Sequence, residues 1–186
     1  MTFTTCGGGA FLHIPKTGGT WIYYLLRENG MVASPFGHEH GHLHNEEWAF
    51  SVLRHPFGWY ASHAAFQRAS GFSTWTGAEH PLAEIVHHQH PTIDGMVRAI
   101  LEESPTFLSR MYGKFLDSSK YVLRNETLVD DIMSLSDRVG WSIKLRSFRE
   151  GRRNETPHGE LSDETKRMIE ECDPEAFMQY VNAPNA

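Results

Sequence analysis

The residues best suited to chemistry lie in one run near the N-terminus, FLHIPKTGGTW at positions 11–21. A short apolar segment, a turn rich in glycine and a second apolar segment follow one another here, an order that predicts strand, tight loop and helix. Such a loop directs backbone N–H groups and a helix N-terminus at one point, which can bind a phosphate or another oxyanion. We expect the anion to be held by Lys16, Thr17, Gly18, Gly19 and Thr20.

This loop differs from the common nucleotide P-loop. The order Gly-x-x-x-x-Gly-Lys-[Ser/Thr] is absent, and Lys16 precedes the glycines instead of following them. Thr17 does follow Lys16, so a P-loop-like nucleotide kinase, which would need Mg²⁺, stays an alternative.

A second candidate anion site follows the run WAFSVL at 48–53, which reads as a buried strand. Arg54-His55-Pro56 ends it, and Pro56 is well placed for the first turn of a helix. Arg54 would therefore lie at the carboxyl end of a strand, where open α/β sheets bind ligands. Ser62 follows about two helical turns later.

The two runs together resemble the nucleotide signatures of sulfotransferases that use 3′-phosphoadenosine 5′-phosphosulfate (PAPS), with motifs most similar to the carbohydrate-type and bacterial members. His-Ile-Pro-Lys-Thr-Gly-Gly-Thr-Trp looks like their 5′-phosphosulfate loop, and Val-Leu-Arg-His-Pro with its later Ser looks like their 3′-phosphate site. The resemblance implies PAPS as cofactor and 3′,5′-adenosine bisphosphate as product. It puts Arg54 and Ser62 at the 3′-phosphate and Trp21 where several cytosolic members stack a Trp on adenine.

The implied reaction moves a sulfuryl group to a hydroxyl or amine of a small-molecule or carbohydrate acceptor. Lys16 suits stabilisation of the leaving phosphate oxygen, by the logic of phosphoryl transfer. A histidine suits removal of the acceptor proton. Carbohydrate-type members often carry that histidine between the two signatures, which makes His42 our first choice and His38 our second. A glutamate that removes the acceptor proton stays an alternative, and the candidates are Glu39, Glu46 and Glu47. The implied reaction requires no metal.

The same segment offers a competing interpretation, because histidines alternate at 38, 40, 42 and 44. Alternating side chains share one face of an extended segment and could hold a metal. Gly37 and Gly41 favour a bent loop instead. A non-catalytic protein that binds a metal or a nucleotide through this loop therefore stays an alternative.

The C-terminal half matches the family more loosely. A strand is expected at 120–124, and Asn125 then stands where the family usually has Tyr, with an expected architectural role. The run 144–153 carries five basic residues and one acid. It is either a solvated basic loop or the remaining wall of the nucleotide site, with Arg152 and Arg153 as the candidate contacts.

Alternating strands and helices predict an α/β protein, a three-layer α/β/α domain with a central, mainly parallel sheet; the family resemblance makes it P-loop NTPase-like. We expect one domain over 1–186, with 70–117 as a helical acceptor region. Helices are expected to begin near positions 21 and 56, to cover 93–101 and 128–139, and to follow caps at Ser162 and Asp173. Side chains expected to pack inward near the end are Cys172, Phe177, Tyr180 and Val181.

Composition limits the possible partners. The net charge of −6 gives no global basic field for nucleic acid or an anionic membrane. No apolar run has the length of a membrane span, and no signal peptide is evident, so a cytoplasmic protein is expected. The two cysteines are expected to be separate thiols. The oligomeric state and the acceptor stay open.

Overall fold

The computed structural model describes residues 2–32, 47–69, 90–145 and 159–183. The chain divides into two compact units. The sheet unit comprises Met1–Leu53, Lys114–Glu155 and Ala183–Ala186, and the helical unit comprises Arg54–Gly113 and Thr156–Asn182. The expectation of a single domain stays a prediction.

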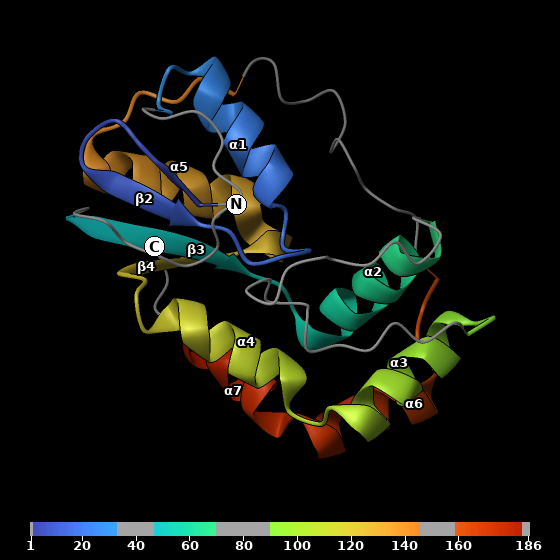
Figure 1. Cartoon of the computed structure of the whole chain (residues 1–186). Coiled ribbons are helices and arrows are strands. Elements are labelled where there is room, and N and C mark those ends of the chain that lie inside the picture. The colour runs from blue at the N-terminus through green and yellow to red at the C-terminus, as the bar shows by residue number, and fades with distance from the viewer. Residues whose placement is uncertain (1, 33–46, 70–89, 146–158, 184–186) are drawn as a thin grey trace. The chain divides into compact units, whose positions relative to one another are not determined.

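The sheet unit contains a four-stranded mixed sheet in the order β1-β2-β3-β4 (Figure 1). β2 and β3 are parallel, β3 and β4 are parallel, and β1 adds an antiparallel edge. The chain is therefore α/β, with seven α-helices in the part that the structure describes. The elements of this unit are β1 (Thr2–Thr4), β2 (Gly9–Leu12), α1 (Gly19–Glu28), β3 (Trp48–Leu53), β4 (Tyr121–Arg124), the 3₁₀-helix η1 (Asn125–Thr127) and α5 (Leu128–Val139).

The register of the parallel strands brings three strand ends to one edge of the sheet. Leu12, the last residue of β2, pairs with Ser51, and Leu53, the last residue of β3, pairs with Arg124. The loop at 13–18 leaves β2 at this edge, and η1 leaves β4 there. Carboxyl ends of parallel strands are where α/β sheets bind ligands.

Helices α1 and α5 cover one face of the sheet (Figure 1). Apolar side chains point to them from alternate strand positions and form a core that excludes water, which is the main stabilising term in such a fold. The sheet contributes Phe11, Phe50, Val52 and Leu123, and the helices contribute Ile22, Leu25, Leu26, Leu128, Ile132 and Leu135. Residues of the opposite face, such as Leu12 and Leu53, are also buried, which is compatible with three layers.

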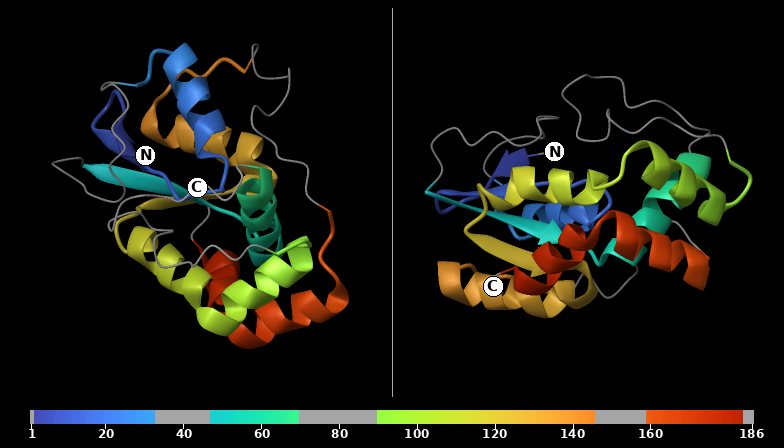
Figure 2. Two further views of the ribbon diagram at one scale, coloured as in Figure 1. Left: turned by 45° about the vertical axis from the view of Figure 1, so that its right-hand side comes forward. Right: turned by 90° about the horizontal axis from the view of Figure 1, so that it is seen from below.

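The helical unit is built from α2 (Pro56–Ala69), α3 (Ile93–Glu103), α6 (Asp163–Cys172), α7 (Pro174–Asn182) and most of α4 (Phe107–Leu116). Helix α3 packs against α2 and α6, and Figure 2 shows α3 and α6 side by side. Its buried side chains recur with helical spacing, as the sequence predicts; they are Met96, Val97, Ile100 and Leu101.

Local capping explains where several helices begin. Ser162 accepts a hydrogen bond from the Thr165 N–H at the N-terminus of α6, and Thr92 does the same for Gly95 at α3. Pro174 opens α7, where its missing N–H costs nothing. The predicted cap at Ser162 is confirmed.

One prediction of an inward-packing residue, that for Val181, is wrong. Val181 is 66% exposed. It lies five residues after the buried Ala176, which is about 140° around the helix and away from the buried face. Phe177, Tyr180 and Cys172 are half-buried, and both Cys6 and Cys172 are free thiols.

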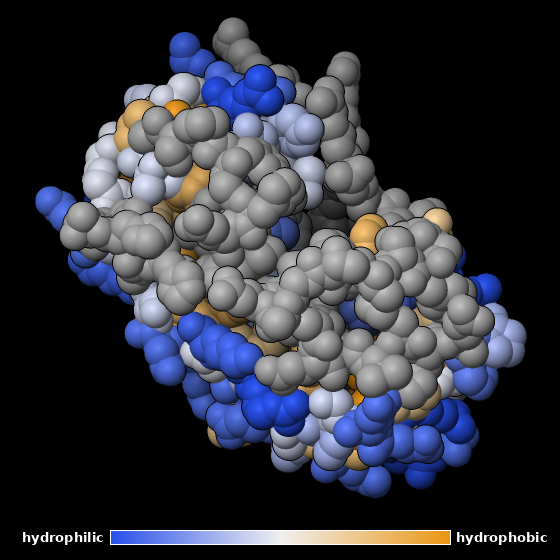
Figure 3. All heavy atoms as spheres, in the orientation of Figure 1, coloured by the Kyte–Doolittle hydropathy of each residue, from blue (hydrophilic) through white to orange (hydrophobic). Residues whose placement is uncertain are grey.

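Figure 3 shows one face of the molecule, on which the described surface is mainly hydrophilic and hydrophobic residues occupy small areas. Among the residues that the structure describes, none of the helices combines the length and the apolar character that a membrane crossing requires.

Candidate oxyanion-binding site

The predicted oxyanion loop joins β2 to α1 through an unusual backbone. Lys16 has a φ of 67°, which few residues with a side chain adopt, and Gly18 has a φ of 95° and is the N-cap residue of α1. Gly18 offers no side chain to cap the helix. The first N–H groups of an α-helix have no partner within the helix, so this end of α1 is suited to an anion.

Both loop glycines are required by close neighbours. A Cβ atom on Gly18 would lie 2.7 Å from Nδ2 of Asn125, and a Cβ on Gly19 would overlap the ring of His13. Real Cβ atoms do not tolerate such contacts. Asn125 therefore lies against the loop at Gly18, and His13 lies against it at the next residue, Gly19. Because neither glycine has a side chain, the backbone there can approach a ligand closely.

The carbonyl of Thr17 is held from a distant part of the chain. Nδ2 of Asn125, the first residue after β4, donates a hydrogen bond to it at 3.0 Å. Strands β2 and β4 are separated by β3, which places them about 10 Å apart. The contact joins the loop after β2 to the start of η1, although β3 lies between β2 and β4 in the sheet.

The remaining loop side chains differ in accessibility. Thr17 is fully buried, and its hydroxyl donates to the Ile14 carbonyl at 2.8 Å, so it stabilises the turn. Thr20 and Lys16 are half-buried. Trp21 is only 9% exposed and belongs to the hydrophobic core of the sheet unit. Its expected stacking on adenine stays a prediction.

The predicted 3′-phosphate residues belong to the helical unit. Arg54 is its first residue and follows Leu53, the end of β3, directly. Its backbone is fixed by Tyr112, whose hydroxyl donates to the Arg54 carbonyl at 2.6 Å, and its side chain runs beside Gly58 in the first turn of α2. Ser62 lies in α2 and is 6% exposed.

Four other predicted residues, His38, His42, Arg152 and Arg153, lie outside the described residues, as do Glu39 and Glu46. Glu47 is described, and its role as an alternative acidic base stays a prediction. It precedes β3 at the amino end, where its N–H donates to Gly8, whereas the oxyanion loop leaves the carboxyl end of the neighbouring strand. About 20 Å of strand separates the two edges.

Within the ranges that the structure describes, no group of three His, Cys, Asp or Glu side chains is arranged to hold a metal ion. The histidines at 38–44 lie outside those ranges, so the metal-binding alternative stays untested.

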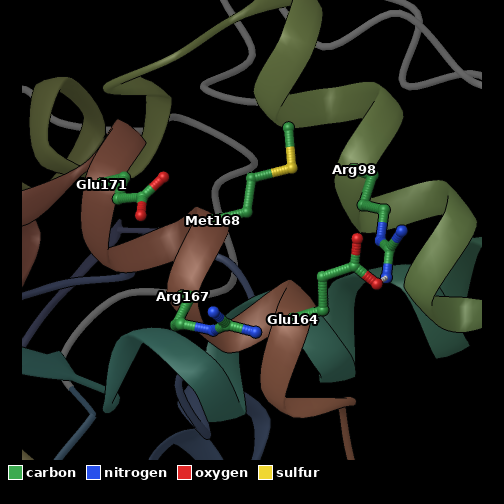
Figure 4. A pocket seen from close by; sticks show the side chains of 5 residues that line it. All are labelled: Arg98, Glu164, Arg167, Met168 and Glu171. Carbon is green, nitrogen blue, oxygen red and sulfur yellow. Dashed lines mark hydrogen bonds and ion pairs between the residues drawn. The ribbon is translucent and has the colours of Figure 1, made fainter.

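A separate cavity of about 380 Å³ lies in the helical unit, between α3 and α6. Figure 4 shows Arg98 and Glu164 pointing toward each other across it, with their charged groups 2.8 Å apart. Arg98 also donates to the Thr165 hydroxyl at 3.0 Å. These charges satisfy one another, so we assign this cavity no part in the oxyanion site.

Two residues of the site were not predicted from the sequence as site residues. His13 lies within the signature itself, two residues before Pro15, and that place in the sequence was the available signal. Asn125 carried no local signal, because its contact with Thr17 joins residues 108 positions apart.

In the comparisons with known proteins, no protein-family model, no curated protein and no solved structure matched this chain.

Proposed function

We propose that this protein is a sulfotransferase that uses PAPS as its donor and has a P-loop-like α/β fold. The observation that carries the proposal is the loop at 13–18, which follows a parallel strand and ends in an uncapped helix N-terminus with Lys16 beside it. Oriented N–H groups and a nearby cation are what a 5′-phosphosulfate requires.

The position of Arg54 in the chain supports the same proposal. It follows the end of β3, the strand adjacent to β2 in the sheet, and a guanidinium there suits a second phosphate. Ser62 would add a hydroxyl donor. A site for a 5′ group and a separate site for a 3′-phosphate specify one cofactor more narrowly than a single phosphate site does.

Chemically, the loop would hold the phosphosulfate in line with the acceptor oxygen. Lys16 would neutralise the charge that develops on the departing phosphate oxygen. Its backbone is held in a sparsely populated conformation, and such backbone strain is concentrated at functional sites. A base would take the acceptor proton, with His42 first and His38 second among the candidates.

The nucleotide kinase has less support. It would use the hydroxyl that follows the loop lysine as a Mg²⁺ ligand. In this protein that hydroxyl belongs to Thr17, is fully buried and donates to the Ile14 carbonyl. Binding of Mg²⁺ there would require the turn to break.

The proposed activity is tested with PAPS labelled in its sulfate group, offered with sugars, small alcohols, phenols and peptides in turn. We expect label transfer to one acceptor class by the wild-type protein and at least about a hundredfold slower transfer by Lys16→Ala. Arg138→Ala, which removes an exposed charge on α5, is the matched control and is expected to transfer normally. Equal rates for wild type and Lys16→Ala would overturn the assignment of Lys16, and transfer to none of the classes would count against the activity.

A further inference from the structure

We infer that Asn125 is a positioning residue for the oxyanion loop: its side-chain amide fixes the peptide between Thr17 and Gly18 so that the Gly18 N–H is directed at the bound 5′-phosphate group. The inference rests on the proposed function. It goes beyond an architectural role, because it assigns Asn125 an effect on one phosphate of one ligand.

The geometry of the peptide group carries the first step. Asn125 Nδ2 donates to the Thr17 carbonyl oxygen at 3.0 Å. The peptide is trans, so its N–H points in the direction opposite to its carbonyl. With the carbonyl held toward η1, the Gly18 N–H is directed away from η1. Rotation of this peptide would break the hydrogen bond.

Electronic coupling is the second step. A hydrogen bond to a carbonyl polarises the whole peptide, and its N–H becomes a better donor by a modest fraction. A negatively charged acceptor gains more from this than a neutral one does. Asn125 therefore both aims the Gly18 N–H and strengthens it.

Close packing is the third step. Gly18 has a φ of 95°, and a Cβ there would lie 2.7 Å from Asn125 Nδ2 and 3.3 Å from Leu128 Cδ2. Glycine at this position allows the amide to approach the loop closely. The conformation of the loop and the position of the amide are thus specified together, although their residues are far apart in sequence.

The test compares two ligands by calorimetry, 3′,5′-adenosine bisphosphate and adenosine 3′-monophosphate, which lacks the 5′-phosphate. We expect Asn125→Ala to bind the bisphosphate about fivefold to twentyfold more weakly than wild type and the monophosphate with unchanged affinity. If Asn125 had only a structural role, Asn125→Ala would weaken the binding of both ligands alike or of neither. Either result would overturn the inference.

Asn29→Ala is the matched control. The Asn29 side chain also donates to a backbone carbonyl, that of Leu25 at 2.9 Å, but at the far end of α1. We expect it to leave both affinities unchanged. If Asn125→Ala does not fold, Asn125→Leu replaces it, because it nearly keeps the volume and removes the donor without adding a charge. The same selective loss is expected, and an unchanged affinity for the bisphosphate would contradict the inference.

The wild-type titration separates this inference from the proposed function. Wild type that fails to bind the bisphosphate contradicts the proposed function itself. Wild type that binds, together with an Asn125→Ala variant that binds equally well, contradicts the role of Asn125 alone.

Discussion

The phenol of Tyr60 donates a hydrogen bond to Oδ2 of Asp173 at 3.3 Å, and both residues are fully buried. The same oxygen accepts the N–H groups of Leu108 and Ser109 at 3.0 and 3.2 Å. The carboxylate of Asp173, which precedes α7, therefore serves the first turn of α4. A buried charge in this position is stabilised by the positive end of the helix and by its donors.

Asp173→Ala is expected to destabilise the protein by about 3 kcal/mol, because it leaves buried donors without their acceptor and opens a cavity. Denaturant unfolding measures the difference. Asp163→Ala is the matched control, since Asp163 is 96% exposed in the neighbouring helix, and its effect is expected within about 0.5 kcal/mol. Similar losses for the two variants would contradict the role of Asp173.

Stability is expected to fall at alkaline pH through Tyr60. Burial, and then the adjacent Asp173 carboxylate, raise the pKa of Tyr60 well above its usual value of 10.0. Above that pH the unfolded chain loses the phenol proton while the folded protein retains it, so the free energy of unfolding decreases as pH rises. Well below pH 10.0 the phenol is protonated in both the folded and the unfolded state, so the contribution of Tyr60 to the free energy of unfolding does not change with pH.

Denaturant unfolding at pH values from about 8 to 11 checks this expectation. Tyr60→Phe removes the titrating group, and its free energy of unfolding should fall less steeply than that of wild type over the alkaline part of the range. Parallel curves for the two proteins would show that Tyr60 does not contribute.

Much of the fold could be predicted because its signals are local. The strand at 48–53 is observed with the predicted bounds, Pro56 opens α2, and α5 is ended by its C-cap residue Gly140, which has a φ of 74°. β1 was not predicted, since three residues with alternating Thr carry little pattern and their pairing with β2 is non-local. α4 was expected only as an unbounded part of the helical region at 70–117, although buried side chains at 107, 108, 111, 112 and 115 have helical spacing.

The site was predictable only in part. The oxyanion loop and Arg54 follow strands at their carboxyl ends, which the order of strand, loop and helix predicts. The neighbours of the loop were not predictable, because Asn125 reaches Thr17 only through the folded sheet. Glu47 is adjacent to β3 in the sequence but lies at the amino end of that strand. Nearness in sequence to a strand therefore does not place a residue at the edge of the sheet where the oxyanion loop lies.

Gly19→Ala is expected to weaken binding of 3′,5′-adenosine bisphosphate by roughly tenfold or more, which corresponds to ~1.4 kcal/mol. The new Cβ would overlap the His13 ring and displace the start of α1. Calorimetric titration measures the loss. Gly159→Ala is the control, because a Cβ there meets nothing within 4 Å. Unchanged affinity in Gly19→Ala would show that the loop does not contact the ligand.

Arg54→Ala is expected to remove most of the preference for 3′,5′-adenosine bisphosphate over adenosine 5′-monophosphate. A charge-assisted hydrogen bond to phosphate contributes about 1.5 to 3 kcal/mol, so the preference should shrink by about tenfold to a hundredfold. Competition titration with both nucleotides gives the ratio, and Arg138→Ala should leave it unchanged. An Arg54→Ala variant that retains the wild-type preference would place the 3′-phosphate elsewhere.

The central claim, a site for the PAPS nucleotide, is tested most directly by titrating wild-type protein with 3′,5′-adenosine bisphosphate and, separately, with Mg·ATP. We expect saturable binding of one bisphosphate per chain, weaker binding of Mg·ATP, and loss of bisphosphate binding in Lys16→Ala. Absence of binding, tighter binding of Mg·ATP, or undiminished binding by Lys16→Ala would contradict the claim.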